Sequence, residues 1–103
     1  MIRVKVEKEN GHFKKISILG HAMYDEYGKD IVCSAVSSIV TTTINGILTI
    51  DKSTITYLAS SKGLTIRVLS NDRVTQLLLN NMIKLLKELE LKYKENIEII
   101  LKN

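Results

Sequence analysis

The sequence predicts an α+β fold, in which two main helices pack on a mostly antiparallel sheet as a two-layer domain with the order ββαββαβ. Two observations carry this prediction. Runs in which apolar and polar residues alternate occur in pairs separated by short turn sequences, and two longer segments repeat apolar residues at helical spacing. A chain of 103 residues fits one core, so we expect a single domain over residues 1–103.

The N-terminal segment predicts a β-hairpin. Its apolar residues alternate with charged ones, at Ile2, Val4 and Val6. Asn10-Gly11 is a strong signal for a tight hairpin turn, so the chain should return as a second strand over residues 12–19 and end it at Gly20. Residues 21–29 hold three charges and two tyrosines without periodicity. We expect them to form a loop.

The segment from Ile31 to Ile50 predicts a helix, with Asp30 as its N-cap. Apolar residues form two adjacent rows at four-residue spacing: Ile31, Ala35 and Ile39, and Val32, Val36, Val40 and Ile44. Nine of the twenty residues are Ser, Thr, Asn or Gly, so the segment is too polar for a bilayer and we expect no membrane partner.

This predicted helix carries no charged residue. A helix without a charged face is usually covered on both sides, and one sheet in a small domain covers only one side. The sequence therefore predicts a homodimer with this helix at or near the interface.

The C-terminal half predicts a second hairpin, a second helix and a last strand. Thr54–Ala59 and Leu64–Leu69 are β-rich runs joined by a short loop containing glycine. The helix should begin at Asn71 or Asp72 and can end at Asn96, before a strand from Ile97. Its expected apolar face is Val74, Leu78, Met82, Leu85, Leu86 and Leu89, and lysines at 84, 87, 92 and 94 crowd its last turns.

Composition excludes several classes of protein. With 45% hydrophobic and 25% charged residues, the chain is neither disordered nor fibrous. The net charge of +4 is scattered and only 5% of residues are aromatic, so we expect no direct nucleic-acid partner. The start MIRVKVEKEN resembles neither a signal peptide nor a transit peptide, and a single cysteine suits a reducing compartment, so we expect a cytoplasmic protein. One Cys and two His are too few for a zinc site, and we expect no metal or organic cofactor.

Residues 20–37, GHAMYDEYGKDIVCSAVS, hold the candidate catalytic groups. Cys33 falls in the first turn of the predicted helix, where unpaired backbone N–H groups favour an anion and lower a thiol pKa. His21 follows Gly20 at the end of a strand, and the loop can return its imidazole to the sulfur. Asp30 either caps the helix, which opposes ionisation of the thiol, or orients His21 and leaves the amides free for an oxyanion. Ser37 lies one turn after Cys33 and can donate a hydrogen bond to the sulfur or to a bound peptide.

Each of these residues also has a structural interpretation. A lone cysteine in an apolar helix is more often a small core residue, although a first-turn position weakens that interpretation for Cys33. A lone histidine at a strand end, such as His21, is more often a surface group. Ser37 fits equally well as a polar filler in a helix rich in Ser and Thr.

The paired motifs GHA at 20–22 and YGKDIVCSAVS at 27–37 resemble the ribosomal-processing cysteine protease Prp family, and the predicted elements agree over essentially the whole chain. The resemblance implies a cytoplasmic, homodimeric endopeptidase that removes an N-terminal extension from the twenty-seventh protein of the large ribosomal subunit. It maps the catalytic pair onto His21 and Cys33, with Gly20, Asp30 and Ser37 as matching motif positions.

The chain departs from the family pattern at two positions. Ser34 stands where the family usually has alanine, and Met23 where a glycine is common in the loop, which affects how easily that loop opens. Tyr24 and Tyr27 are candidates for lining a substrate cleft, and the alternative is that they anchor the loop to the surface. The resemblance suggests a large apolar residue, Phe, before the cleaved bond.

Two other functions compete with proteolysis. A noncatalytic assembly factor would bind ribosomal protein or RNA through the lysine-bearing second helix, with strong salt dependence and no need for Cys33. A redox-active thiol protein would instead form a sulfenate at Cys33 and release no peptide product.

Overall fold

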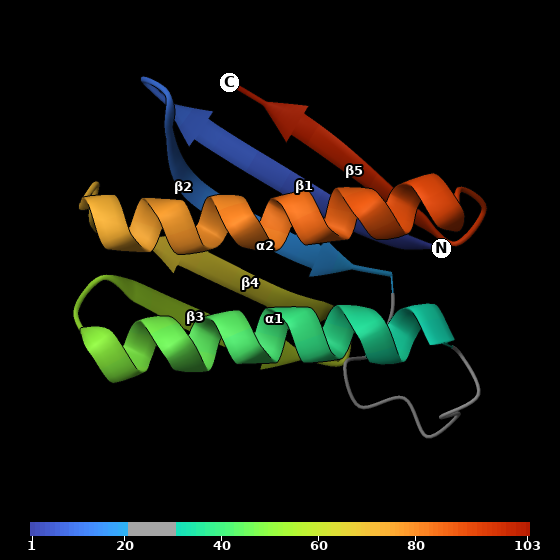
Figure 1. The fold of residues 1–103 in the computed structure, drawn as a ribbon, viewed down its shortest axis with the longest axis horizontal. Coiled ribbons are helices and arrows are strands. Elements are labelled where there is room, and N and C mark those ends of the chain that lie inside the picture. The colour runs from blue at the N-terminus through green and yellow to red at the C-terminus, as the bar shows by residue number, and fades with distance from the viewer. Residues whose placement is uncertain (21–30) are drawn as a thin grey trace.

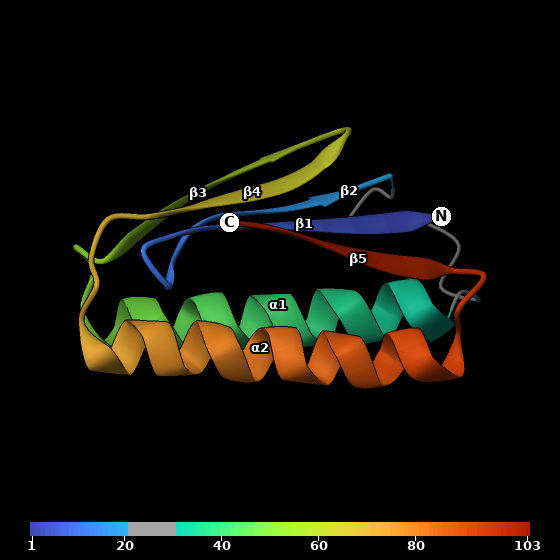
Figure 2. The ribbon, with the colours of Figure 1, turned by 90° about the horizontal axis from the view of Figure 1, so that it is seen from above.

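The computed structural model describes residues 1–20 and 31–103. Its strands are β1 (Ile2–Glu9), β2 (His12–Leu19), β3 (Ile55–Ser60), β4 (Gly63–Val68) and β5 (Ile97–Lys102), and its helices are α1 (Ile31–Ile50) and α2 (Arg73–Lys92). Within these ranges one five-stranded sheet has the order β3-β4-β2-β1-β5, and the two helices lie side by side on one of its faces (Figures 1 and 2). Among the strand pairs of the described residues, β1 with β5 is the one parallel pair. The predicted fold class and element order are confirmed.

The first hairpin brings the end of β2 beside the N-terminus. Asn10 and Gly11 both have positive φ, at 52° and 79°, as the tight turn between twisted strands requires. Arg3 pairs with Leu19 across the hairpin. As a result, the chain reaches Gly20 next to Met1, at the edge of the described part that precedes residue 21.

The second hairpin is displaced by one residue from the predicted runs. β3 begins at Ile55 rather than Thr54, and β4 begins at Gly63 and ends at Val68. Thr54 and Leu69 still face each other, because the Leu69 N–H donates to the Thr54 carbonyl at 2.8 Å.

One core lies between the sheet and the two helices. Its fully buried side chains come from strands and helices alike, so each helix is needed to cover its part of the inner face of the sheet. The largest of them are Ile16, Ile18, Ile47, Ile55, Ile66, Leu79, Met82, Leu86 and Ile97.

The two apolar rows predicted for α1 have different surroundings. The row from Val32 to Ile44 is buried in the core, with Ile47 continuing it. In the other row Ile31 is 68% exposed, whereas Ala35 and Ile39 are half-buried. Four residues advance a helix by about 400°, so a row at this spacing drifts by about 40° per step. The second row therefore begins facing solvent at Ile31 and turns toward the core by Ile39.

By length and composition α1 meets the criterion for a helix that can cross a membrane. In the structure Val36 and Val40 are completely buried in the shared core. Packing inside the domain therefore accounts for the buried row of this helix, whereas Ile31 and Ile50 at its two ends are exposed.

The start of α2 was predicted correctly. Asp72 is its N-cap, and the Asp72 carboxylate accepts a hydrogen bond from the Thr75 N–H at 3.0 Å. A hydrogen bond with the Ser70 hydroxyl, followed by that with the Thr75 N–H, holds the pKa of Asp72 below its ordinary value.

The predicted apolar face and end of α2 need correction. Val74 and Leu85 are 46% and 37% exposed, and the buried residues are Thr75, Leu79, Met82, Ile83 and Leu86. The helix packs beside α1 as well as on the sheet, so the stripe turned inward is rotated from the one predicted from leucine spacing. The helix ends at Lys92 rather than Asn96, because residues 93–96 form a turn in which the Asn96 carbonyl accepts from the Ile2 N–H at 2.8 Å.

Candidate active site

Cys33 is the third residue of α1 and lies in the first turn of that helix. Its side chain is 7% exposed and belongs to the core cluster, beside the buried Val32. Packing fixes the thiol at the end of a rigid element.

The electrostatics of the first turn of α1 favour an anion at this position. Helix N-terminal amides lack intrahelical acceptors and carry a partial positive charge. The first turn of α1 contains no acidic residue that would oppose this charge. The N-terminus of α1 would therefore stabilise a thiolate at Cys33.

Gly20 determines how the chain leaves β2. Its φ is +85°, a conformation that side chains rarely adopt, and a Cβ here would collide with the Met1 carbonyl oxygen. Only glycine allows β2 to end so close to the N-terminus. Gly20 therefore sets the starting point of the chain toward His21.

Ser37 is half-buried and lies on the same side of α1 as Cys33, about 6 Å further along the helix axis. This side of the helix faces the β3–β4 hairpin. A groove of about 260 Å³ runs there, lined by Val40, Thr41, Ile44, Asn45, Tyr57, Ala59 and Leu64. No local pattern predicts this groove, because it forms between segments that are far apart in the chain.

The remaining predicted site residues lie outside the described residues. They are His21, Met23, Tyr24, Tyr27 and Asp30. The pairing of His21 with Cys33, the two alternatives for Asp30 and the tyrosine-lined cleft stay predictions. Among residues 1–20 and 31–103, no group of three His, Cys, Asp or Glu side chains is arranged to hold a metal ion.

A cysteine buried in the first turn of a helix, at the same end of the molecule as a strand that ends at a constrained glycine (Figure 1), is an arrangement suited to a thiol hydrolase. Comparisons with known proteins agree with this class. The family model described as cysteine protease Prp matches residues 1–98. The ribosomal processing cysteine protease Prp of Staphylococcus aureus is 34% identical over 103 residues, covering 96% of this chain and 97% of the relative. The chain belongs to the cysteine protease Prp family, and it is a cysteine protease.

Solved structures give the same result. Prp from S. aureus in complex with a covalently linked product peptide has a TM-score of 0.90 and 29% identity, over 99% of this chain and 100% of that one. The same protease with a substrate peptide has a TM-score of 0.85 and 30% identity, with 99% and 100% covered. A protein from Streptococcus mutans has a TM-score of 0.83 and 25% identity, with 99% and 94% covered.

Proposed function

We propose that this protease acts in the cytoplasm and removes the N-terminal extension of the twenty-seventh protein of the large ribosomal subunit. The observation that carries the proposal is the position of Cys33 in the first turn of α1, within a family whose S. aureus member is a ribosomal processing protease. That relative has been solved with a product peptide covalently linked to it, as a mechanism with an acyl-enzyme requires.

In the proposed mechanism the Cys33 thiolate attacks the carbonyl carbon of the scissile bond and forms a C–S bond. The carbonyl oxygen becomes an oxyanion that accepts hydrogen bonds from first-turn N–H groups of α1. As the C–N bond breaks, the His21 imidazolium gives its proton to the departing amine. Neutral His21 then takes a proton from water, whose oxygen attacks the thioester and releases the carboxylate product and the thiolate.

The covalently linked product peptide in the S. aureus relative favours proteolysis over a redox function, in which Cys33 would form a sulfenate and release no peptide. A noncatalytic binding function would instead rely on α2, where the exposed Lys84 and Lys87 lie on the outer surface. Such binding would survive the loss of Cys33.

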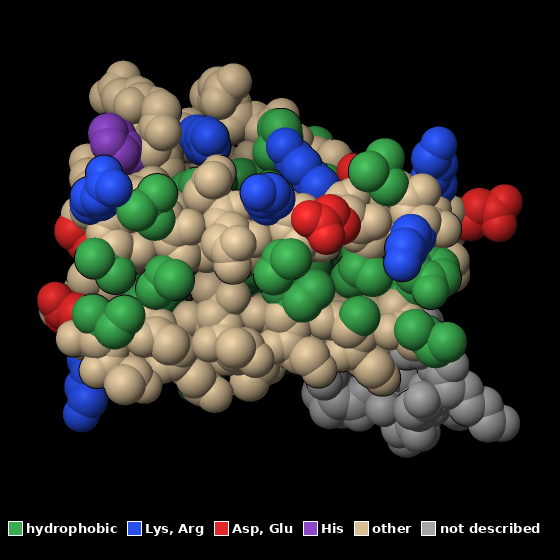
Figure 3. All heavy atoms as spheres, in the orientation of Figure 1, with side chains coloured by type: hydrophobic (Ala, Val, Ile, Leu, Met, Phe, Trp, Pro, Cys, Tyr) green, Lys and Arg blue, Asp and Glu red, His purple; other side chains and the backbone are tan. Residues whose placement is uncertain are grey.

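We also propose that the protein is a homodimer through the outer face of α1. Figure 3 shows the Lys and Arg side chains of this view mainly over α2, and none along the middle of α1. On a chain with net charge +4, an uncharged face is where two copies approach with the least repulsion. Ser38 and Thr42 are exposed on this outer face.

Sedimentation velocity tests the dimer. We expect twice the mass of the chain for the wild type and for Asn81→Arg, a control on the exposed side of α2, and the mass of one chain for Ser38→Arg. A monomeric wild type would refute the dimer, as would an intact Ser38→Arg dimer.

Product analysis tests the protease proposal. The substrate is a synthetic peptide that spans the extension and the first residues of the mature ribosomal protein from the same organism. We expect mass spectrometry to detect two fragments with the wild type and with Ser34→Ala, and none with Cys33→Ala. Undiminished cleavage by Cys33→Ala would exclude Cys33 as the nucleophile, and an uncut peptide with the wild type would exclude this substrate.

A further inference from the structure

We propose that the groove between α1 and β3 holds an apolar, extended part of the substrate extension, which adds as a strand to the edge of β3. This inference rests on the proposed function and assigns the binding segment of its substrate. Three observations support it: the lining of the groove, its place on the side of α1 that bears Cys33, and the backbone groups that β3 presents.

The groove is suited to uncharged side chains. Ile44 and Val40 form its floor from α1, and Tyr57 and Ala59 form its wall from β3. None of the described residues that line it is charged, although the chain as a whole carries a net charge of +4. Apolar side chains can enter this groove without leaving a buried charge unpaired.

The groove lies along the side of α1 that bears Cys33. Cys33, Ser37, Val40 and Ile44 follow one another at spacings of four, three and four residues, so they share one side of the helix. Val40 is about 10 Å and Ile44 about 16 Å along the axis from Cys33, at 1.5 Å per residue. An extended peptide advances about 3.3 Å per residue. Side chains about three and five residues from the cleaved bond would therefore reach the groove.

The hydrogen-bond register of the second hairpin shows which backbone groups of β3 face outward. The Leu69 N–H donates to the Thr54 carbonyl, and these residues lie opposite each other, so they form a hydrogen-bonded pair. Such pairs alternate along antiparallel strands, so residues 56, 58 and 60 bond to β4. The N–H and C=O groups of Tyr57 and Ala59 then point away from the sheet.

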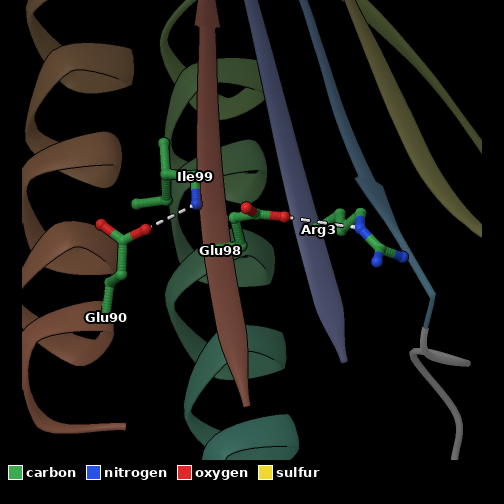
Figure 4. Close-up of polar contacts among 4 residues, drawn as sticks. All are labelled: Arg3, Glu90, Glu98 and Ile99. Atoms are coloured by element: carbon green, nitrogen blue, oxygen red, sulfur yellow. Dashed lines mark hydrogen bonds and ion pairs between the residues drawn. The ribbon is translucent and has the colours of Figure 1, made fainter. Parts of the chain in front are cut away.

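β3 is an open edge of the sheet, whereas a side chain of α2 covers part of the opposite edge, β5. All residues from Thr56 to Ser60 are exposed. On β5, the Glu90 carboxylate of α2 accepts a hydrogen bond from the outward Ile99 N–H at 2.8 Å (Figure 4). A side chain from α2 therefore occupies part of the β5 edge, and β3 is the edge suited to strand addition.

The groove wall and the outward backbone groups of β3 belong to the same two residues. Tyr57 and Ala59 line the groove with their side chains and present their backbone groups beside it. Figure 2 shows the β3–β4 hairpin rising away from α1 toward its tip, on the side of the N-terminal half of α1. A peptide strand at this edge would place alternate side chains over α1 and run toward Cys33. The thioester of the proposed mechanism keeps the segment N-terminal to the cleaved bond attached to Cys33, and the S. aureus relative has been solved with a covalently linked product peptide, so the extension is the occupant that we propose.

Backbone N-methylation of the peptide tests strand addition without altering the protein. A series of peptides spanning the extension carries one N-methyl group at each of the third to sixth residues before the cleaved bond. We expect kcat/KM to fall at least about 10-fold at alternate positions and to change little at the positions between them. A uniform effect along the series would overturn strand addition at β3.

Substitutions in β3 test the groove itself. Ala59→Trp fills the groove, and Leu58→Trp is its matched control, because the neighbouring side chain points to the opposite face of the sheet. We expect Ala59→Trp to raise KM for the full extension peptide at least about 10-fold, and to leave kcat/KM unchanged for a peptide cut to two residues before the bond. Leu58→Trp should leave both unchanged. An equal loss for both peptides, or no loss, would refute the groove assignment.

A binding measurement separates this inference from the proposed function. Hydrogen exchange on the Cys33→Ala variant should show slower exchange of the Tyr57 and Ala59 amides when the full peptide is added. If the wild type cuts the peptide while these amides stay unprotected, the groove proposal fails and the protease proposal stands. If their protection depends on protein concentration rather than on peptide, a second copy occupies the edge and the groove proposal is wrong.

Discussion

Replacing Gly20 by alanine perturbs the point from which the chain sets out toward His21. The new Cβ would collide with the carbonyl oxygen of Met1, in a backbone with φ of +85°. Gly11→Ala is the matched control, because Gly11 also has positive φ, at +79°, but a Cβ there meets nothing within 4 Å. The pair separates the cost of the backbone conformation from the cost of the collision.

The magnitude follows from these two costs. A non-glycine residue in the left-handed region lowers the free energy of unfolding by about 1–2 kcal/mol. The alanine also restricts the unfolded chain, which raises the free energy of unfolding by about 0.4–1 kcal/mol. Gly11→Ala should therefore lower the free energy of unfolding by about 1 kcal/mol. Forcing an atom into occupied space adds about 1–3 kcal/mol for Gly20→Ala. The Met1 carbonyl belongs to the same peptide group as the Ile2 N–H, which donates to the Asn96 carbonyl at 2.8 Å, so this carbonyl cannot turn aside without weakening that hydrogen bond.

Urea denaturation and thermal denaturation, each followed by circular dichroism, measure the free energy of unfolding and the melting temperature of both variants. We expect the extra loss in Gly20→Ala to lower its melting temperature by roughly 5–20 °C relative to Gly11→Ala. At a temperature where both variants are folded, Gly20→Ala should also lose kcat/KM on the extension peptide, and Gly11→Ala should retain it. Equal stabilities, within about 0.5 kcal/mol, would refute the close approach of Gly20 to Met1.

Three further outcomes are expected. Leu86→Ala, at a completely buried position, should lower the free energy of unfolding by about 2–5 kcal/mol in urea titration, and a loss under about 1 kcal/mol would place this side chain outside the core. The pKa of Asp72 is lowered in the folded state, so the ionised carboxylate contributes its full stabilisation above the unfolded pKa and loses it as pH falls through the folded pKa. In thermal scans, Asp72→Asn should therefore melt at a lower temperature than the wild type at pH 7. Near pH 2 the two proteins should melt together. Glu90→Ala should speed amide exchange at Ile99 in NMR while β1 amides stay protected, and unchanged exchange would show that the carboxylate does not hold this edge.

Local patterns in the sequence were enough to predict most of the fold. Asn10-Gly11 and the alternation around it specify a hairpin, because few residues adopt the positive φ that this turn needs. Asp72 was predictable as a helix start because a carboxylate satisfies amides that the helix leaves unpaired.

The predictions were wrong where tertiary packing determines which side of a helix is buried. Val74 and Leu85 fit an apolar stripe at helical spacing, but the side of α2 that is buried depends on how α1 lies beside it, which spacing within one helix does not specify. Ile31 begins an apolar row and yet is 68% exposed, because that row drifts around the helix. The parallel pairing of β1 with β5 likewise joins two ends of the chain that have no local signal in common.

The candidate site was predictable in part. Placing Cys33 in a first turn required only the helix start, and the structure puts it third in α1. The groove beside it was not predictable, because Ile44 and Tyr57 meet only after the second hairpin has folded onto the helix. The roles of His21 and Asp30 stay predictions.

Trapping the acyl-enzyme tests most directly whether Cys33 forms the covalent bond to substrate. Wild-type protein is mixed with the extension peptide and quenched in acid within the first turnover, and the intact protein and its fragments are weighed by mass spectrometry. We expect a mass increase equal to the N-terminal peptide fragment, carried by Cys33 and absent from Cys33→Ala. Rapid cleavage without any adduct on this cysteine, or an adduct on another residue, would contradict a thiolate nucleophile at the first turn of α1.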